Sequence, residues 1–176
     1  MKRLILLGLA FVVTFANAQE IYFDYDRGTN FHSYKTYQWV ASPAAKSANQ
    51  LLDQHIRDVV DAQLALKHLR GVESGGNLQV TYRTAVDTEK QFDGWGRGPR
   101  IAGINRVTTS TINVGMLVID VYDSTQGKLV WRGWVRNTLD IKKDPDKNYR
   151  NLQKAVAKLL VNYPPPSIRQ RARENR

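Results

Sequence analysis

The stretch LVIDVYDSTQGKLVWRGWV, residues 117–135, has the alternation of a β-hairpin. Apolar residues recur at every second position on both sides of the connection DSTQG (123–127), where Gly127 suits a positive φ. A one-residue slip in pairing would move one strand's apolar set to the wrong face. The pattern therefore predicts a long hairpin over 106–123 and 128–139. If Tyr122 pairs with Lys128, one face carries Leu117, Ile119, Val121, Leu129, Trp131, Gly133 and Val135.

The two tryptophans of this hairpin are expected on opposite faces of the sheet. Trp131 falls on the apolar face and is expected in the core, whereas Trp134 lies between Arg132 and Arg136 on the other face. These three residues are a candidate binding surface. In the alternative interpretation, Trp134 packs across the strands against Met116 and Val118, while the arginines cover the indole or pair with Asp120.

Further strands are expected at 20–26, 34–40 and 77–86, where apolar and polar residues alternate. The apolar spacing at 50–70 predicts a helix with Leu52, Ile56, Val59, Val60 and Leu66 buried, Asp53 and Asp61 solvated, and Gly71 as the left-handed residue after its end. A second helix is expected from Pro145 to Tyr163, capped by Asp144. We expect an α+β, two-layer fold: a mainly antiparallel sheet of four to five strands with two amphipathic helices on one face.

A Gly-rich stretch interrupts the strand pattern between residues 87 and 105 and predicts a long loop. The glycines at 94, 96 and 98 match neither common phosphate-binding pattern. Trp95, Arg97 and Arg100 could instead stack on a sugar or a lipid headgroup or dock a partner. The alternative is a loop with no binding role.

The ends of the chain have compositions of their own. Lys2 and Arg3, the apolar run 4–15 and the sequence Ala16-Asn17-Ala18 predict a signal peptide at 1–18, cleaved before residue 19. The 158 residues that remain have a net charge of +8 and suit a single α+β domain at 19–166, followed by a basic, disordered tail at 167–176. The tail's arginines could contact an anionic surface or only aid solubility. We expect a periplasmic protein that is not lipidated. Association with the outer membrane and secretion are the alternative destinations. Nucleic acid is not an expected partner.

The residues offer little for catalysis. The chain has no cysteine, which excludes a thiol nucleophile, and its three histidines are not spaced to converge. The strained serine motif G-x-S-x-G does not occur. Asp24 and Asp26 could hold a cation, but hydrogen bonds within the following turn are the favoured interpretation. The sequence therefore predicts no enzyme, no metal site and no cofactor.

Four stretches resemble a known bacterial family, the domain of unknown function 4136. They are FDYDRGTNFHSYKTYQWV (23–40), LLDQHIRDVVDAQLALKHLR (51–70), GMLVIDVYDSTQGKLVWRGWV (115–135) and AVAKLLVNYPP (155–165). Members are small exported proteins that are often predicted to be lipoproteins, so the resemblance implies the cell envelope and a fold but no catalytic residue. This chain lacks the acylated cysteine of many relatives.

Together these observations predict a non-enzymatic periplasmic binding or assembly-accessory domain. Its expected partner is an envelope component: cell-wall polymer, anionic lipid or protein. The first alternative is a structural or stress-related envelope protein that acts only through protein partners, and an enzyme of unknown class is the second.

Overall fold

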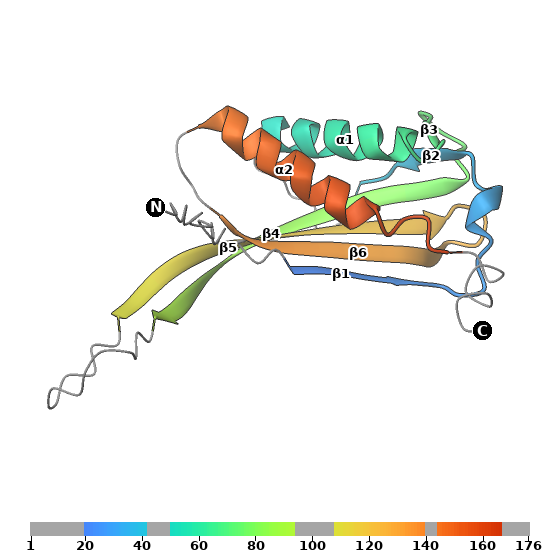
Figure 1. Ribbon diagram of the computed structural model, residues 1–176. Helices are drawn as coiled ribbons and strands as arrows, with labels where there is room; N and C mark the ends of the chain where they lie inside the picture. The colour runs from blue at the N-terminus through green and yellow to red at the C-terminus, as the bar shows by residue number, and fades with distance from the viewer. Residues whose placement is uncertain (1–19, 42–49, 94–107, 140–143, 167–176) are drawn as a thin grey trace, which may run out of the picture.

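The protein is described by a computed structural model that covers residues 20–41, 50–93, 108–139 and 144–166 (Figure 1). The predicted signal peptide, the C-terminal tail and residues 94–105 of the 87–105 stretch lie outside these residues. Strands, helices and one short 3-10 helix follow in this order: β1 (Glu20–Tyr25), η1 (Phe31–Ser33), β2 (Thr36–Trp39), α1 (Gln50–Ala65), β3 (Arg70–Gly71), β4 (Leu78–Asp93), β5 (Thr108–Asp123), β6 (Lys128–Leu139) and α2 (Pro145–Leu160).

The strands form one six-stranded mixed sheet in the order β1-β6-β5-β4-β2-β3. The α+β class is confirmed, but the expected four to five strands are too few. Three pairings are antiparallel, β1 with β6, β6 with β5 and β5 with β4, whereas β2 runs parallel to both β4 and β3. Parallel neighbours need a crossover, and α1 supplies it between β2 and β4. The two-residue strand β3 is too short to leave an alternating pattern.

Both helices lie on the same side of the sheet and leave the other side open (Figure 1). The core lies between these layers and contains the buried stripes of α1 and α2 together with the inward side chains of the strands. Its largest fully buried side chains include Trp131, Tyr163, Ile56, Leu64, Leu78 and Ile119.

The central hairpin has the predicted faces but a different register. Asp123 pairs with Lys128 and Val121 with Trp131, so a bulge at Val130 separates the two pairings. Because of this extra residue, Val130 is buried and Leu129 is only partly buried, contrary to the expectation that Leu129 belongs to the core face. Beyond the bulge the parity is restored, and Trp131, Gly133 and Val135 face the helices as predicted.

Helix α1 ends at Ala65, five residues earlier than predicted. The N–H of Leu69 donates to the Leu64 carbonyl and that of His68 to the Ala65 carbonyl, at 3.1 and 2.9 Å. These bonds form a Schellman motif, in which His68 (φ 62°) takes the left-handed position predicted for Gly71. Leu66 therefore lies past the helix and is 71% exposed, while Leu69 turns into the core.

Asp61 and Asp53 face the sheet rather than solvent, which corrects the prediction for this side of α1. Asp61 Oδ1 accepts hydrogen bonds from the Tyr37 hydroxyl (2.6 Å) and the Trp39 indole N–H (2.8 Å). Asp53 accepts one from the Tyr82 hydroxyl and pairs with Arg57. Aromatic side chains with polar tips thus join helix and sheet through the two carboxylates.

Helix α2 begins as predicted, with the Asp144 side chain accepting hydrogen bonds from the N–H groups of Asp146 and Lys147 and with Pro145 at the first turn. It ends at Leu160, three residues before the expected Tyr163. Tyr163 is nevertheless buried, in the segment that leaves the helix.

The predicted loop at 87–105 is wrong over its first residues, because β4 continues to Asp93. Its predicted end at 105 lies outside the described residues, and β5 is described from Thr108. Pairing runs without a break from Leu78–Asp123 to Asp93–Thr108. The first residues of β5, 108–112, pair with the end of β4 but with no described residue of β6. There β4 and β5 continue as an arm that leaves the body of the sheet (Figure 1). Within the described part of the chain, no helix is long and apolar enough to cross a membrane.

Candidate binding surface

The open face of the sheet carries the residues that the sequence singled out on β6. Trp131 is fully buried on the helix side, where its indole N–H donates to the Asn162 carbonyl (3.3 Å) and its ring meets that of Tyr163 edge to face. Trp134 lies on the opposite side, directly across from Val118. The predicted division of the two tryptophans is therefore confirmed.

Tyr22 of β1 is the residue that sequence reasoning missed. It pairs with Trp134 across the strands, and the two rings stack at a centroid distance of 4.2 Å with 16° between their planes. Tyr22 is 52% exposed, so one side of the stack is open to solvent. Its position on the polar face of residues 20–26 was visible in the sequence, but the neighbour of that strand was not.

Arg132 is held by a buried carboxylate. Its guanidinium donates two hydrogen bonds to Asp120, one of them at 3.0 Å, and Arg83 donates a third from β4, also at 3.0 Å. The hydrogen bonds to Asp120 raise the pKa of Arg132 above its usual value. Asp120 is only 3% exposed, so the two arginines supply the charge that its burial requires. The predicted pairing of Arg132 with Asp120 is confirmed.

Arg136 lies at the other edge of the ring stack. Its guanidinium nitrogen is 3.6 Å from a carboxylate oxygen of Glu20, the cross-strand neighbour on β1. Trp134 thus sits between a tightly held arginine and one in a looser ion pair. A flat aromatic surface and guanidinium donors are therefore adjacent on the open face. We call Tyr22, Arg132, Trp134 and Arg136 the β1–β6 platform.

The other candidate residues divide into two groups. Trp95, Arg97 and Arg100 lie outside the described residues, so the structure does not place them relative to the platform.

Asp26 accepts hydrogen bonds from the Gly28 N–H, the Thr29 hydroxyl and Lys128, which organises the turn after β1 as predicted. The Lys128 hydrogen bond is the main cause that lowers the Asp26 pKa to about 2.

Metal ligands do not gather in the described part of the chain: no group of three or more His, Cys, Asp or Glu residues there could hold an ion. Asp24, the other carboxylate considered at this turn, accepts a hydrogen bond from the Tyr25 N–H (2.8 Å). The arrangement on the open face offers stacking and hydrogen bonding.

Comparison with known families places the chain. The model of the domain of unknown function family DUF4136 matches residues 21–165. The chain belongs to this family. The family's name assigns no activity, and no curated protein matches the chain.

Solved structures resemble the chain at low sequence identity. A PDZ domain protein from Parabacteroides distasonis is 12% identical, with a TM-score of 0.57 over 86% of this chain. The chain spans 38% of that protein's length. The PelC dodecamer from Paraburkholderia phytofirmans is 9% identical, with a TM-score of 0.48 over 81% of this chain and 95% of its own. At 12% identity, the match to the PDZ domain protein shows similarity of fold alone.

Proposed function

We propose that this protein is a non-enzymatic binding domain of the bacterial cell envelope, and that the β1–β6 platform contacts a sugar-containing envelope polymer. The observation that carries the proposal is the exposed stack of Tyr22 on Trp134, on the sheet face that neither helix covers. The predicted signal peptide at residues 1–18 supports the location.

The chemistry of the platform favours a sugar ring as the bound group. An aromatic face offers a flat apolar surface of the size of one ring, and Arg132 and Arg136 offer donors for hydroxyl groups beside it. Because Asp120 fixes the Arg132 guanidinium, little side-chain entropy is lost when that donor engages a ligand.

Charge argues against an anionic lipid at this face. Clusters of four or more basic residues are typical of sites for anionic lipid, but here Arg83, Arg132 and Arg136 are matched by carboxylates on the same face. Asp120 pairs with Arg83 and Arg132, and Glu20 pairs with Arg136. Asp24 adds a third carboxylate as the cross-strand neighbour of Arg132.

Apolar area argues against a large protein interface at the platform. The buried centre of a protein–protein interface is typically an extended apolar area with few charged residues. Among the exposed large hydrophobic side chains of the described residues, only Tyr22 belongs to the platform; the others lie on the helices, on the opposite face of β1 or elsewhere. A partner protein is therefore kept as an outcome of the test.

Co-sedimentation with insoluble cell-wall polymer tests the proposal. Tyr22→Ala removes the outer ring of the stack and is expected to weaken binding about two- to tenfold, the range of one aromatic contact. Phe23→Ala is the matched control, because Phe23 is also exposed on β1 but points to the opposite face. Equal binding by wild type and Tyr22→Ala would contradict the proposal.

Salt dependence and truncation separate the remaining classes of partner. Binding through the platform should persist as salt rises, whereas binding of the arginine tail to a polyanion should fall steeply and disappear when residues 167–176 are deleted. Capture of an envelope protein without any polymer would favour the alternative of a structural protein acting through protein partners.

A further inference from the structure

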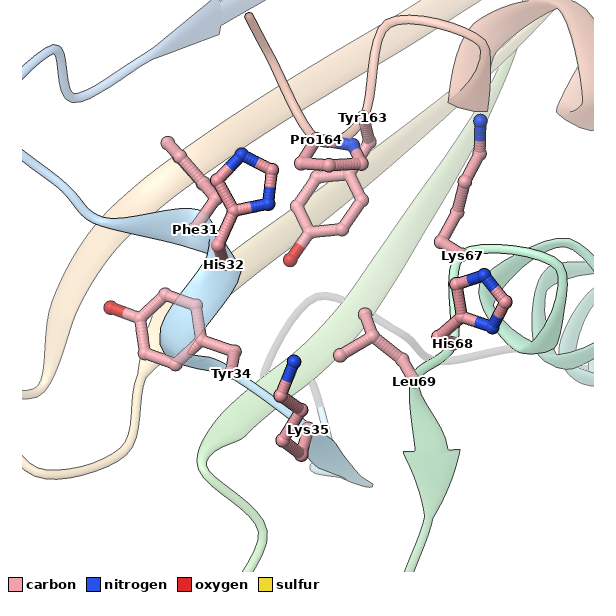
Figure 2. A pocket seen from close by; sticks show the side chains of 9 residues that line it. All are labelled: Phe31, His32, Tyr34, Lys35, Lys67, His68, Leu69, Tyr163 and Pro164. Atoms are coloured by element: carbon pink, nitrogen blue, oxygen red, sulfur yellow. The ribbon is translucent and has the colours of Figure 1, made fainter. Parts of the chain in front are cut away.

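A pocket of about 120 Å³ lies where three segments meet at the end of the sheet (Figure 2). The walls come from η1 and the residues after it, from the residues that follow α1, and from the segment after α2. Nothing in the sequence pattern connects these segments, which are far apart in the chain. The lining residues are Phe31, His32, Tyr34, Lys35, Lys67, His68, Leu69, Tyr163 and Pro164.

Tyr163 brings a buried hydroxyl without a partner to this pocket. The residue is 2% exposed, and its hydroxyl makes no hydrogen bond to any described residue. Figure 2 shows the hydroxyl pointing into the space between the walls. Buried polar groups are almost always hydrogen-bonded, so a ligand atom or water is expected to complete this one.

The ring of Tyr163 is fixed in place. It meets Phe31 and Trp131 edge to face, at centroid distances of 5.8 and 5.5 Å. Burial raises the pKa of the phenol, so the group stays protonated and can donate. The hydroxyl is therefore a preorganised hydrogen-bond donor.

The charge around the pocket is positive. Four of the nine lining residues are basic, His32, Lys35, Lys67 and His68, and none is acidic. Tyr34, the other lining phenol, donates to Asp123 at 2.7 Å, and Figure 2 shows its hydroxyl pointing away from the pocket. The Lys35 ammonium points inward in the same view. A donor beside positive charge favours an anion.

The backbone ties the walls of the pocket together. The Arg70 N–H donates to the Lys35 carbonyl at 2.9 Å, joining the strand that follows α1 to the residues before β2. The Schellman motif at the end of α1 sets the direction of Lys67 and His68. Basic side chains from two elements are thereby held near one cavity.

The volume limits the ligand to a small group. Pockets for drug-sized ligands measure roughly 300–1,000 Å³, whereas a single water needs about 10–15 Å³. About 120 Å³ therefore holds several atoms, the size of one carboxylate or phosphate group.

We propose that this pocket binds a small oxyanion, a carboxylate or a phosphate group, with the Tyr163 hydroxyl donating to an anion oxygen and Lys35 supplying positive charge. The site lies apart from the β1–β6 platform and shares no residue with it. Its test is independent of the proposed envelope function.

Titration calorimetry and thermal unfolding with inorganic phosphate or acetate test the site, with chloride at matched ionic strength as the reference. Both measurements use the mature protein. Wild type is expected to bind at least one of the two oxyanions and to unfold at a higher temperature in its presence than in chloride. Stronger binding of phosphate or of acetate identifies the preferred group. If neither anion differs from chloride, the pocket holds only water and the proposal is overturned.

Tyr163→Phe is the decisive variant. It removes only the hydroxyl, so it should fold with unchanged or higher stability, since an unpaired buried polar group is lost. Anion binding should nevertheless weaken about ten- to hundredfold, as expected for one hydrogen bond to a charged group. Lys35→Gln should also weaken binding, whereas Lys158→Gln, an exposed lysine on α2, should not. Undiminished binding by Tyr163→Phe would overturn the proposal.

Discussion

Gly133 lies on β6 under two buried side chains, and Gly133→Ala is expected to destabilise the fold. A Cβ at this position would lie 2.3 Å from Cη2 of Trp131 and 2.8 Å from Cδ1 of Leu159. Both neighbours are fully buried, so neither can move into solvent. Over-packing of a core costs about 1–3 kcal/mol, and the restricted unfolded chain returns about 0.4–1 kcal/mol. We expect a net loss of about 1–2 kcal/mol.

Urea unfolding followed by tryptophan fluorescence measures this loss, which corresponds to a fall in Tm of a few degrees for a chain of this length. Gly28→Ala is the matched control, because its Cβ would meet nothing closer than Asp26 Oδ1 at 3.6 Å. The control should stay within about 0.5 kcal/mol of wild type. Unchanged or higher stability of Gly133→Ala would refute the packing of α2 and Trp131 over β6.

Three carboxylates give further predictions. The pKa of Asp26 is lowered in the folded protein from 3.8 to about 2, so its stabilising contribution is present above about pH 4 and is lost as the pH falls towards 2. Asp26→Asn should therefore show a flatter fall in stability over that window in acid unfolding curves; an unchanged slope would contradict this. Asp144→Ala removes the cap of α2 and should cost about 1 kcal/mol in urea unfolding, and no cost would refute the capping role. Asp120→Ala leaves two partly exposed arginines without their shared partner and should cost about 1–3 kcal/mol, whereas the exposed Asp24→Ala should cost little; equal costs would contradict the paired role of Asp120.

Local patterns predicted what depends on neighbours in the chain. Alternation on β6 separates Trp131 from Trp134, because a strand turns successive side chains to opposite faces wherever it lies in the sheet. The cap of α2 could be predicted equally well. The Asp144 side chain accepts hydrogen bonds from free N–H groups of the first turn, and Pro145 has no N–H that needs a partner. The pairing at the connection differs from the predicted one by one residue and the bulge at Val130 adds a second, so beyond the bulge the register is shifted by two residues and these faces stay intact.

Pairings between distant segments were not predictable in the same way. The partner of β1 is set by the whole sheet, so the stack of Tyr22 on Trp134 could not be read from residues 20–26. The hydrogen bonds between α1 and the sheet also join segments that are distant in the chain. The sequence pattern places Asp61 on a solvated face, because it does not show that β2 brings Tyr37 and Trp39 to this carboxylate. The same holds for the pocket around Tyr163.

The end of α1 was misplaced for a different reason. Gly71 is the residue type that favours a left-handed position, but the burial of Leu69 against the core decides where the Schellman motif forms. Histidine tolerates that conformation better than most residues with a side chain. A tertiary contact therefore overrode the local preference for glycine.

Hydroxyl-radical footprinting of the protein from residue 19 onward, with and without soluble fragments of cell-wall polymer, tests the β1–β6 platform most directly. Aromatic side chains open to solvent are oxidised, and a bound polymer shields those that it covers. We predict that bound polymer protects Tyr22 and Trp134 while oxidation of Phe23 on the opposite face of β1 stays unchanged. Binding that leaves Tyr22 and Trp134 as reactive as in the free protein would contradict the account.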